Sequence, residues 1–213
     1  MKKFIALSLT MFFAIAMNAQ DAEKILKDLS EKAKTFKTVK ATYTYRLIDS
    51  MSGLDESSEG EITIKDEKYH LDTGDYLIIS DGTSQWTYQR DVNEVLIDDM
   101  EDLGDDGFDP KTMFTIWEDD FNYALKGSVN MEGVDCWEIH LYPNNSEDKT
   151  FHTIKMFVDK KKMEVFRLEV KGREGTDVIY KMKTFQTDQA VPDSKFQFNE
   201  GDFPGVEIID NRL

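Results

Sequence analysis

The stretch that decides the fold is residues 77–88, LIISDGTSQWTY. Its Asp81-Gly82 pair lies between two apolar runs, and this arrangement is the strongest short-range sequence signal for a β-hairpin. A tight loop made by these two residues would pair Ser80 with Thr83 across the hairpin. The sequence therefore predicts two antiparallel strands that are joined at Asp81-Gly82.

The predicted hairpin gathers large apolar side chains on one face. With that pairing Leu77 lies opposite Trp86, and the alternation of side chains along a strand puts Ile79 and Tyr88 on the same face. Such a face is unexpected on a chain of 213 residues with a formal net charge of −16. An ordinary packed core is the simpler interpretation, and a surface that binds an apolar ligand is the alternative.

Strand-like alternation continues on both sides of the hairpin. Upstream, Tyr43, Tyr45 and Leu47 alternate with polar residues, and so do Ile62 and Ile64. Downstream, strands are expected near 95–97 and over the ranges 121–131, 134–142, 151–158, 163–171 and 176–185.

The second of these longer strands carries Trp137, Ile139 and Leu141 on one face. About eleven antiparallel strands and two helical segments make a mainly β (α+β) fold. We expect a strongly curved sheet or an unclosed antiparallel barrel, which either fills its interior with side chains or keeps a cavity.

Two helical segments accompany the strands. Residues 21–36 place apolar side chains at helical spacing, which predicts an amphipathic helix before the sheet. Asp109 and Pro110 read as the start of a short helix inserted into the sheet. Each helix would plug the open side of the sheet or act as a lid. The apolar side chains of the inserted helix are Met113, Phe114, Ile116 and Trp117.

The first 19 residues have the basic start, apolar middle and small-residue end of a secretory signal. We expect cleavage near Ala19, a single domain over 20–213, and an exported protein that is free in solution. Because the chain is strongly negative, electrostatic binding to nucleic acid or to anionic lipid headgroups is disfavoured.

No set of residues in the sequence nominates a catalytic or metal site. His70, His140 and His152 lack metal-ligand spacing, and Cys136 has no partner base nearby in a recognisable motif. The acidic run over 98–109 fails the calcium-loop pattern at its third and twelfth positions. We therefore expect no enzymatic activity, no cofactor and no metal.

Four segments in order resemble the LolA family, the periplasmic carriers of outer-membrane lipoproteins. FKTVKATYTY at residues 36–45 is similar to the start of the family, and GEITI at 60–64 to its glycine-led second strand. ISDGTSQWTY at 79–88 resembles its Ser-Asp-Gly turn, and DSKFQFNEGDFPGVEIID at 193–210 its closing segment. The resemblance spans about residues 21–212.

The resemblance implies an unclosed barrel whose apolar cavity, covered by helices, receives the acyl chains of lipoproteins. It also implies delivery from an inner-membrane ABC transporter to an outer-membrane receptor, by a monomer in the periplasm. The side chains implied for the cavity and its lid are Tyr43, Tyr45, Leu47, Ile62, Ile64, Leu77, Ile79, Trp86, Tyr88, Met113, Phe114, Ile116, Trp117, Trp137, Ile139 and Leu141.

One departure from the family concerns how the lid is held. Members of the family carry an arginine-proline pair after the second strand, and the arginine latches the lid. The matching positions here are Asp66 and Glu67, flanked by Lys65 and Lys68. The alternative function, a periplasmic protein of the same fold that binds or senses a lipid or another hydrophobic molecule, stays open.

Overall fold

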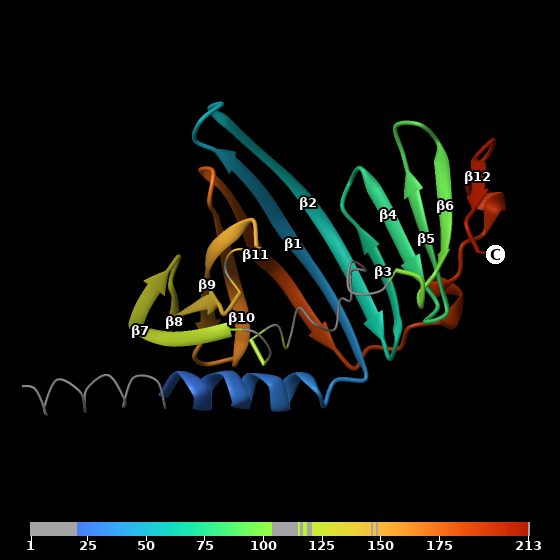
Figure 1. The fold of residues 1–213 in the computed structure, drawn as a ribbon. Helices are drawn as coiled ribbons and strands as arrows, with labels where there is room; N and C mark the ends of the chain where they lie inside the picture. The colour runs from blue at the N-terminus through green and yellow to red at the C-terminus, as the bar shows by residue number, and fades with distance from the viewer. Residues whose placement is uncertain are drawn as a thin grey trace, which may run out of the picture. The chain divides into compact units, whose positions relative to one another are not determined.

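The residues that the computed structural model describes are 21–103, 115, 117–118, 121–145, 147 and 149–212. Within them, twelve strands form one sheet in the order β12-β6-β5-β4-β3-β2-β1-β11-β10-β9-β8-β7 (Figure 1). The order begins and ends with different strands, so the sheet is not closed. The prediction of a mainly β protein with an unclosed sheet and an N-terminal helix is confirmed.

The strands of the second half follow the predicted ranges closely, whereas β1 and β2 are longer than the predicted stretches and β3 was not predicted. In the first half they are β1 (Thr38–Asp49), β2 (Leu54–Lys65), β3 (Lys68–Asp72), β4 (Tyr76–Ser80), β5 (Ser84–Gln89) and β6 (Glu94–Asp99). In the second half they are β7 (Phe121–Met131), β8 (Val134–Pro143), β9 (Phe151–Asp159), β10 (Glu164–Gly172), β11 (Thr176–Thr187) and β12 (Glu207–Asp210). Two short 3₁₀ helices, η4 (Asp193–Phe196) and η5 (Glu200–Asp202), precede β12.

The last strand differs from the expectation of antiparallel pairing throughout. β12 pairs with β6 in parallel, with Ile208 opposite Val95. A parallel pair needs a long connection between its strands. Here the chain between β6 and β12 includes five other strands and the two 3₁₀ helices, so the closing segment can return beside β6.

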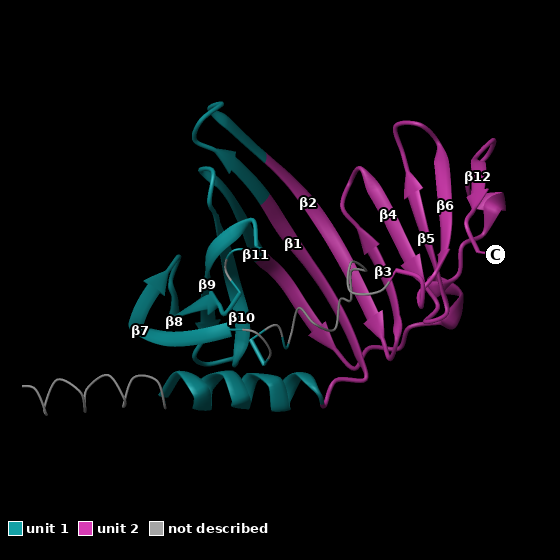
Figure 2. Cartoon of the chain, viewed as in Figure 1, with its two compact units in different colours: residues 1–34, 46–56, 114–181 teal, residues 35–45, 57–113, 182–213 magenta. Residues whose placement is uncertain are grey.

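The chain divides into two compact units (Figure 2). Unit 1 comprises residues 1–34, 46–56 and 114–181, and unit 2 comprises residues 35–45, 57–113 and 182–213. Unit 1 therefore contains the N-terminal helix with β7 to β10, and unit 2 contains β3 to β6, β12 and the two 3₁₀ helices. β1, β2 and β11 contribute residues to both units.

Unit 1 is organised around one apolar core between the helix and the sheet. The helix covers residues 21–33, and Ala22 and Leu26 are 0% and 1% exposed. Fully burying a side chain such as Leu26 contributes about 1.5–3 kcal/mol, so this packing outweighs the weak intrinsic stability of a short helix. The remaining members of the core are Ile25, Leu29, Trp117, Ile139, Leu141, Ile154, Met156 and Val158.

The central hairpin of unit 2 forms where predicted but with a different register. Ser80 pairs with Gln85, and Leu77 with Tyr88, so the expected pairing of Ser80 with Thr83 is wrong by two residues. The Asp81 carboxylate explains the longer loop. Its Oδ1 accepts hydrogen bonds of 2.9 Å from the backbone N–H groups of Thr83 and Ser84.

An even shift leaves every side chain on its predicted face. Ile79 lies opposite Trp86, and Leu77 lies opposite Tyr88, so these four residues do share one face of the hairpin. Gly82 adopts a φ of 92°, a conformation that glycine tolerates far better than other residues. The loop of the hairpin thus depends on one carboxylate and one glycine.

We expect Asp81→Ala to lower the free energy of unfolding by about 1–2 kcal/mol, because two backbone N–H groups lose their acceptor. Asp91→Ala, at an exposed position in the turn that follows β5, is the matched control and should change stability by less than about 0.5 kcal/mol. Urea unfolding followed by circular dichroism measures both. Equal effects would show that the Asp81 carboxylate does not hold the loop.

Candidate functional site

The pairing of β2 to β6 sorts their side chains onto two faces. We call one the Trp86 face; it carries Thr63, His70, Ile79, Trp86 and Ile97 in one cross-strand row and Glu61, Asp72, Leu77, Tyr88 and Val95 in the next. We call the other the Tyr43 face; its rows are Ile62, Leu71, Ile78, Thr87 and Leu96, then Ile64, Tyr69, Ser80, Gln85 and Asp98.

The contact between Tyr43 and Gly60 shows that Tyr43 lies on the Tyr43 face. A Cβ atom built on Gly60 would lie 2.4 Å from Cζ of Tyr43, so the tyrosine ring lies directly over the glycine. Gly60 shares its face of β2 with Ile62 and Ile64, since the three positions alternate along the strand. By the same alternation along β1, Tyr45 and Leu47 follow Tyr43.

The predicted site residues of this region therefore divide between the two faces. Leu77, Ile79, Trp86 and Tyr88 lie on the Trp86 face, and Ile62 and Ile64 lie on the opposite one. The two sets cannot line one surface of this sheet. Alternation along each strand predicted correctly which of its residues share an apolar side. It did not predict how β2 aligns with β4, because the intervening strand β3 sets that alignment.

The Trp86 face is covered by the C-terminal segment, which we define as residues 192–206. The Phe203 ring packs on Tyr88 with 4.6 Å between ring centroids, and Phe198 stacks on Phe203 at 4.8 Å. Phe196 in η4 is fully buried. Lys195 pairs with Glu61 of the same face over 3.6 Å. The large apolar side of the hairpin is therefore covered by the chain itself.

The Tyr43 face is predominantly apolar over β1, β2 and β3. Tyr43, Ile62, Ile64, Tyr69 and Leu71 are each 7% exposed or less. Farther along the same face, Ile78 and Leu96 are half-buried. The sequence missed Tyr69, Leu71, Ile78 and Leu96 as members of this face, although Tyr69 and Leu71 alternate along KYHLD and were detectable as a strand signal.

In unit 1 the predicted residues lie in the core beneath the helix. Ile139 and Leu141 are fully buried there, and Trp137 packs against the same cluster. The indole N–H of Trp117 donates a 2.9 Å hydrogen bond to Oγ of Ser30 in the helix. The other expected lid residues, Met113, Phe114 and Ile116, lie outside the described residues, and so does the expected helix start at Asp109.

The positions that match the family's latch adjoin the C-terminal segment. Lys65 donates a 3.2 Å hydrogen bond to the backbone oxygen of Val191 and pairs with Asp193 over 2.8 Å. Lys68 also pairs with Asp193, over 3.4 Å, and the hydrogen bond from Lys65 holds the pKa of Asp193 below its ordinary range. Lys65, Asp66 and residues 188–192 line a hollow of about 940 Å³.

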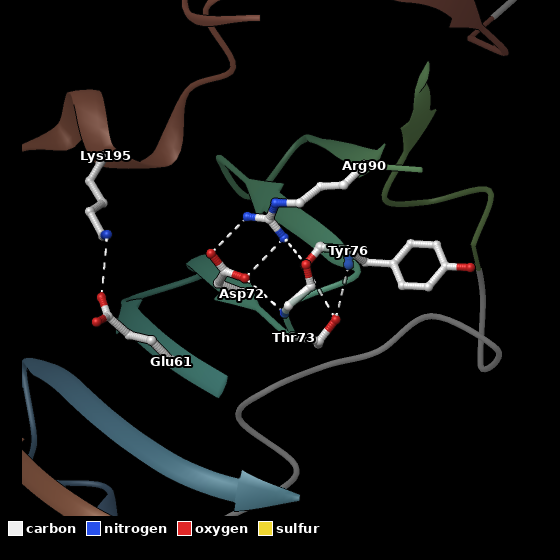
Figure 3. A network of polar contacts seen from close by, with 7 residues as sticks. Glu61, Asp72, Thr73, Tyr76, Arg90 and Lys195 are labelled. Atoms are coloured by element: carbon white, nitrogen blue, oxygen red, sulfur yellow. Dashed lines mark hydrogen bonds and ion pairs between the residues drawn. The ribbon is translucent and has the colours of Figure 1, made fainter. Parts of the chain in front are cut away.

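A second polar network fixes the turn between β3 and β4 (Figure 3). The Arg90 guanidinium donates to both carboxylate oxygens of Asp72, over 3.0 and 2.8 Å, and to the backbone oxygen of Gly74. Burial alone would raise the pKa of Asp72, but the hydrogen bonds from Gly74 and Arg90 outweigh it and lower the pKa. Because Asp72 belongs to the Trp86 face, this network supports the turn from that side of the sheet.

No three His, Cys, Asp or Glu side chains gather in a metal-binding arrangement within the part of the chain that the structure describes. No helix among the described residues is long and apolar enough to cross a membrane. Cys136 is fully buried, and burial raises the pKa of its thiol, so the thiolate form is disfavoured.

An unclosed sheet, an amphipathic helix at residues 21–33 and a predominantly apolar Tyr43 face define the class of fold of the described residues. A family model described as outer membrane lipoprotein carrier protein LolA matches residues 34–199. The chain belongs to this family, and the resemblance found in the sequence is confirmed.

Individual proteins are similar to the chain at low identity. An uncharacterized protein of Methanocaldococcus jannaschii is 26% identical over 205 residues, which are 92% of this chain and 58% of that protein. The chain thus spans little more than half of that relative. An outer-membrane lipoprotein carrier protein of Francisella tularensis subsp. novicida is 24% identical over 159 residues, 68% of this chain and 76% of the carrier.

A solved structure shares the fold. The crystal structure of a conserved protein from Thermus thermophilus is similar with a TM-score of 0.59 at 12% identity. The likeness covers 90% of this chain and 99% of that protein. The topology of the described chain therefore recurs in a protein of very different sequence.

His70 contributes a pH dependence to the stability of the fold. Burial lowers the pKa of His70 below its ordinary value of 6.5, and the charge of Lys195 lowers it further, against the opposing effect of Asp72 and Glu61. A lowered pKa in the folded state means that stability is present above pH 6.5 and is lost as the pH falls below it. Carboxylates titrate below about pH 4.5, outside this window.

We therefore expect the free energy of unfolding to decrease between about pH 7 and pH 5 in the parent protein. His70→Gln should remove part of that decrease, whereas His152→Gln, at an exposed position, should leave it unchanged. Urea titrations at several pH values measure these slopes. The same pH dependence in all three proteins would contradict a role for His70.

Proposed function

We propose that the chain is a periplasmic carrier that binds the acyl chains of lipoproteins on the Tyr43 face and transports them from the inner to the outer membrane. Membership of the LolA family supports the carrier class. The observation that carries the proposal is the Tyr43 face itself, which presents buried and half-buried apolar side chains from Tyr43 to Leu96. The ligand residues proposed from the sequence that lie on it within unit 2 are Tyr43, Tyr45, Ile62 and Ile64.

The physical need for such a surface follows from the ligand. Burying an acyl chain contributes about 0.8 kcal/mol per methylene, so a lipid-modified protein cannot cross an aqueous compartment without a cover for its chains. A carrier must supply that cover and still release its cargo. Side chains that are partly exposed in the absence of ligand, such as Ile78 and Leu96, provide an area that the ligand can gain without first displacing a packed core.

The Trp86 face does not take part in this proposal. The C-terminal segment occupies part of it, since the Phe203 ring packs on Tyr88 and Lys195 pairs with Glu61. We assign Leu77, Ile79, Trp86 and Tyr88 to holding that segment. We assign Trp117, Trp137, Ile139 and Leu141 to the core beneath the helix, with Trp117 tying the residues before β7 to the helix.

The partners and the compartment complete the proposal. Delivery by an inner-membrane ABC transporter, handover to an outer-membrane receptor and export by a signal cleaved near Ala19 are inferred from the family. A formal net charge of −16 favours partner surfaces that carry basic residues. The carrier needs no catalytic group, because it only binds and releases the acyl chains.

Neighbouring residues of β4 provide a matched test of the proposed face. Ile78 lies half-buried on the Tyr43 face, and Leu77 lies buried on the opposite one. We expect Ile78→Ser to weaken binding of a fluorescently labelled acyl ester about 5- to 30-fold, since one aliphatic contact of about 1–2 kcal/mol is lost. Leu77→Ser should instead lower the free energy of unfolding by about 2–4 kcal/mol and leave the affinity of the folded protein unchanged.

Circular dichroism first establishes the temperature range in which each variant is folded, and fluorescence titration is then carried out within it. Weaker binding by folded Leu77→Ser together with unchanged binding by Ile78→Ser would place the ligand on the Trp86 face. Failure of the parent protein to bind any acyl probe would contradict the carrier function as a whole.

A further inference from the structure

Three polar side chains of the Tyr43 face are joined by hydrogen bonds. The Tyr69 hydroxyl donates a hydrogen bond to Oε1 of Gln85, and Nε2 of Gln85 donates to Oγ1 of Thr87 over 3.2 Å. Tyr69 is 1% exposed and Gln85 is 9% exposed, while Thr87 is half-buried. We call these three residues the polar trio.

The sheet itself brings the trio together. Tyr69, Ser80 and Gln85 lie in one cross-strand row over β3, β4 and β5. The small side chain of Ser80 lets the tyrosine ring reach across β4, and Ser80 Oγ is engaged with the Gly82 backbone N–H over 3.1 Å. Gln85 and Thr87 are two residues apart on β5, so their side chains are neighbours on the same face.

The trio has hydrogen-bonding capacity beyond its internal bonds. The Gln85 carboxamide carries two N–H groups, of which Thr87 takes one, and the Thr87 hydroxyl accepts that bond and still has its own hydrogen to donate. Two donors thus lie side by side, one on the buried Gln85 and one on the half-buried Thr87, whose row also holds Ile78 and Leu96. Donors in such a place lose free energy unless an acceptor reaches them.

We propose that Gln85 and Thr87 bind the ester carbonyl oxygen of an acyl ligand on the Tyr43 face; this inference rests on the proposed function. A carbonyl oxygen has two lone pairs, which match two adjacent donors. An acyl ester would thus lay its hydrocarbon chain along Ile62, Leu71 and Ile78 and its carbonyl oxygen on the trio.

The surrounding charge favours a neutral ester over a free carboxylate. Asp98 lies directly opposite Gln85 on the same face, where β5 pairs with β6. A fatty-acid carboxylate at the trio would be repelled by this acidic residue, whereas a neutral carbonyl is not. The trio therefore gives the face a preference among lipids that apolar contact alone would not provide.

The test compares two ligands that differ in the proposed acceptor. Monopalmitoylglycerol carries an ester carbonyl, and 1-O-hexadecylglycerol has the same chain length with an ether in place of the ester. Each is titrated into the full-length protein by competition with a fluorescently labelled acyl ester. We expect the ester to bind about 5- to 30-fold more tightly than the ether, as for the loss of one or two hydrogen bonds.

Variants assign the preference to the trio. Thr87→Val replaces the hydroxyl with a methyl group of similar size, and we expect it to reduce the ester preference to less than about twofold, with ether binding unchanged. Thr63→Val is the matched control, because Thr63 lies on the Trp86 face of a nearby strand. It should keep the full preference.

The outcomes separate this inference from the proposed function. Equal binding of ester and ether by the parent protein would overturn the role of the trio while leaving acyl binding intact. An ester preference that survives in Thr87→Val, or that is lost in Thr63→Val, would likewise overturn it. Absence of binding for both ligands would instead contradict the proposed function.

Discussion

The alternation of side chains along β2 to β6 constrains the rest of unit 2. Consecutive side chains along a strand point to opposite faces of the sheet. The pairing between strands therefore places all residues of one cross-strand row on the same face. The register places Ile62 and Leu71 on one face and Ile79 and Trp86 on the other. Two apolar surfaces result, back to back, and each needs its own cover.

The chain supplies one of these covers from its C-terminal segment. Phe203 packs on Tyr88 of the Trp86 face, and the ion pairs Lys65–Asp193 and Lys195–Glu61 join the same segment to β2. Individual surface ion pairs contribute little to stability, so aromatic packing provides most of the attachment. We propose that the Tyr43 face serves a ligand and that its polar trio gives the surface a point of chemical discrimination.

Much of the fold could be predicted from the sequence, since alternation and turn residues report directly on single strands. The strands over 121–131 and 134–143 and the hairpin at Asp81 are examples. The register of that hairpin could not be predicted, because the Asp81 side chain replaced a two-residue loop with a longer one. The alignment of β2 with β4 depends on β3. That strand is short, so its alternation pattern is weak and the alignment could not be predicted.

The candidate site was harder to predict than the fold for a related reason. The sequence pattern of apolar residues on a strand is the same whether their side chains contact a ligand or a distant segment of the same chain. Trp86 and Tyr88 carried the clearest aromatic signal, yet Phe203, more than a hundred residues later, packs on Tyr88. The weaker signal of Tyr69 and Leu71 marked the other face. Family resemblance indicated a cavity but not which side of the sheet forms it.

Isotope-filtered NMR with a protonated acyl ligand and methyl-labelled protein tests most directly which face holds the ligand. Isoleucine and leucine methyl groups occur on both faces of the same strands, so the two possibilities are read in one spectrum. Ligand contacts to Ile62, Ile64, Leu71 and Ile78 are the predicted result. Contacts to Leu77, Ile79 and Ile97, with none to the first group, would contradict the assignment of the Tyr43 face as the lipid-binding surface.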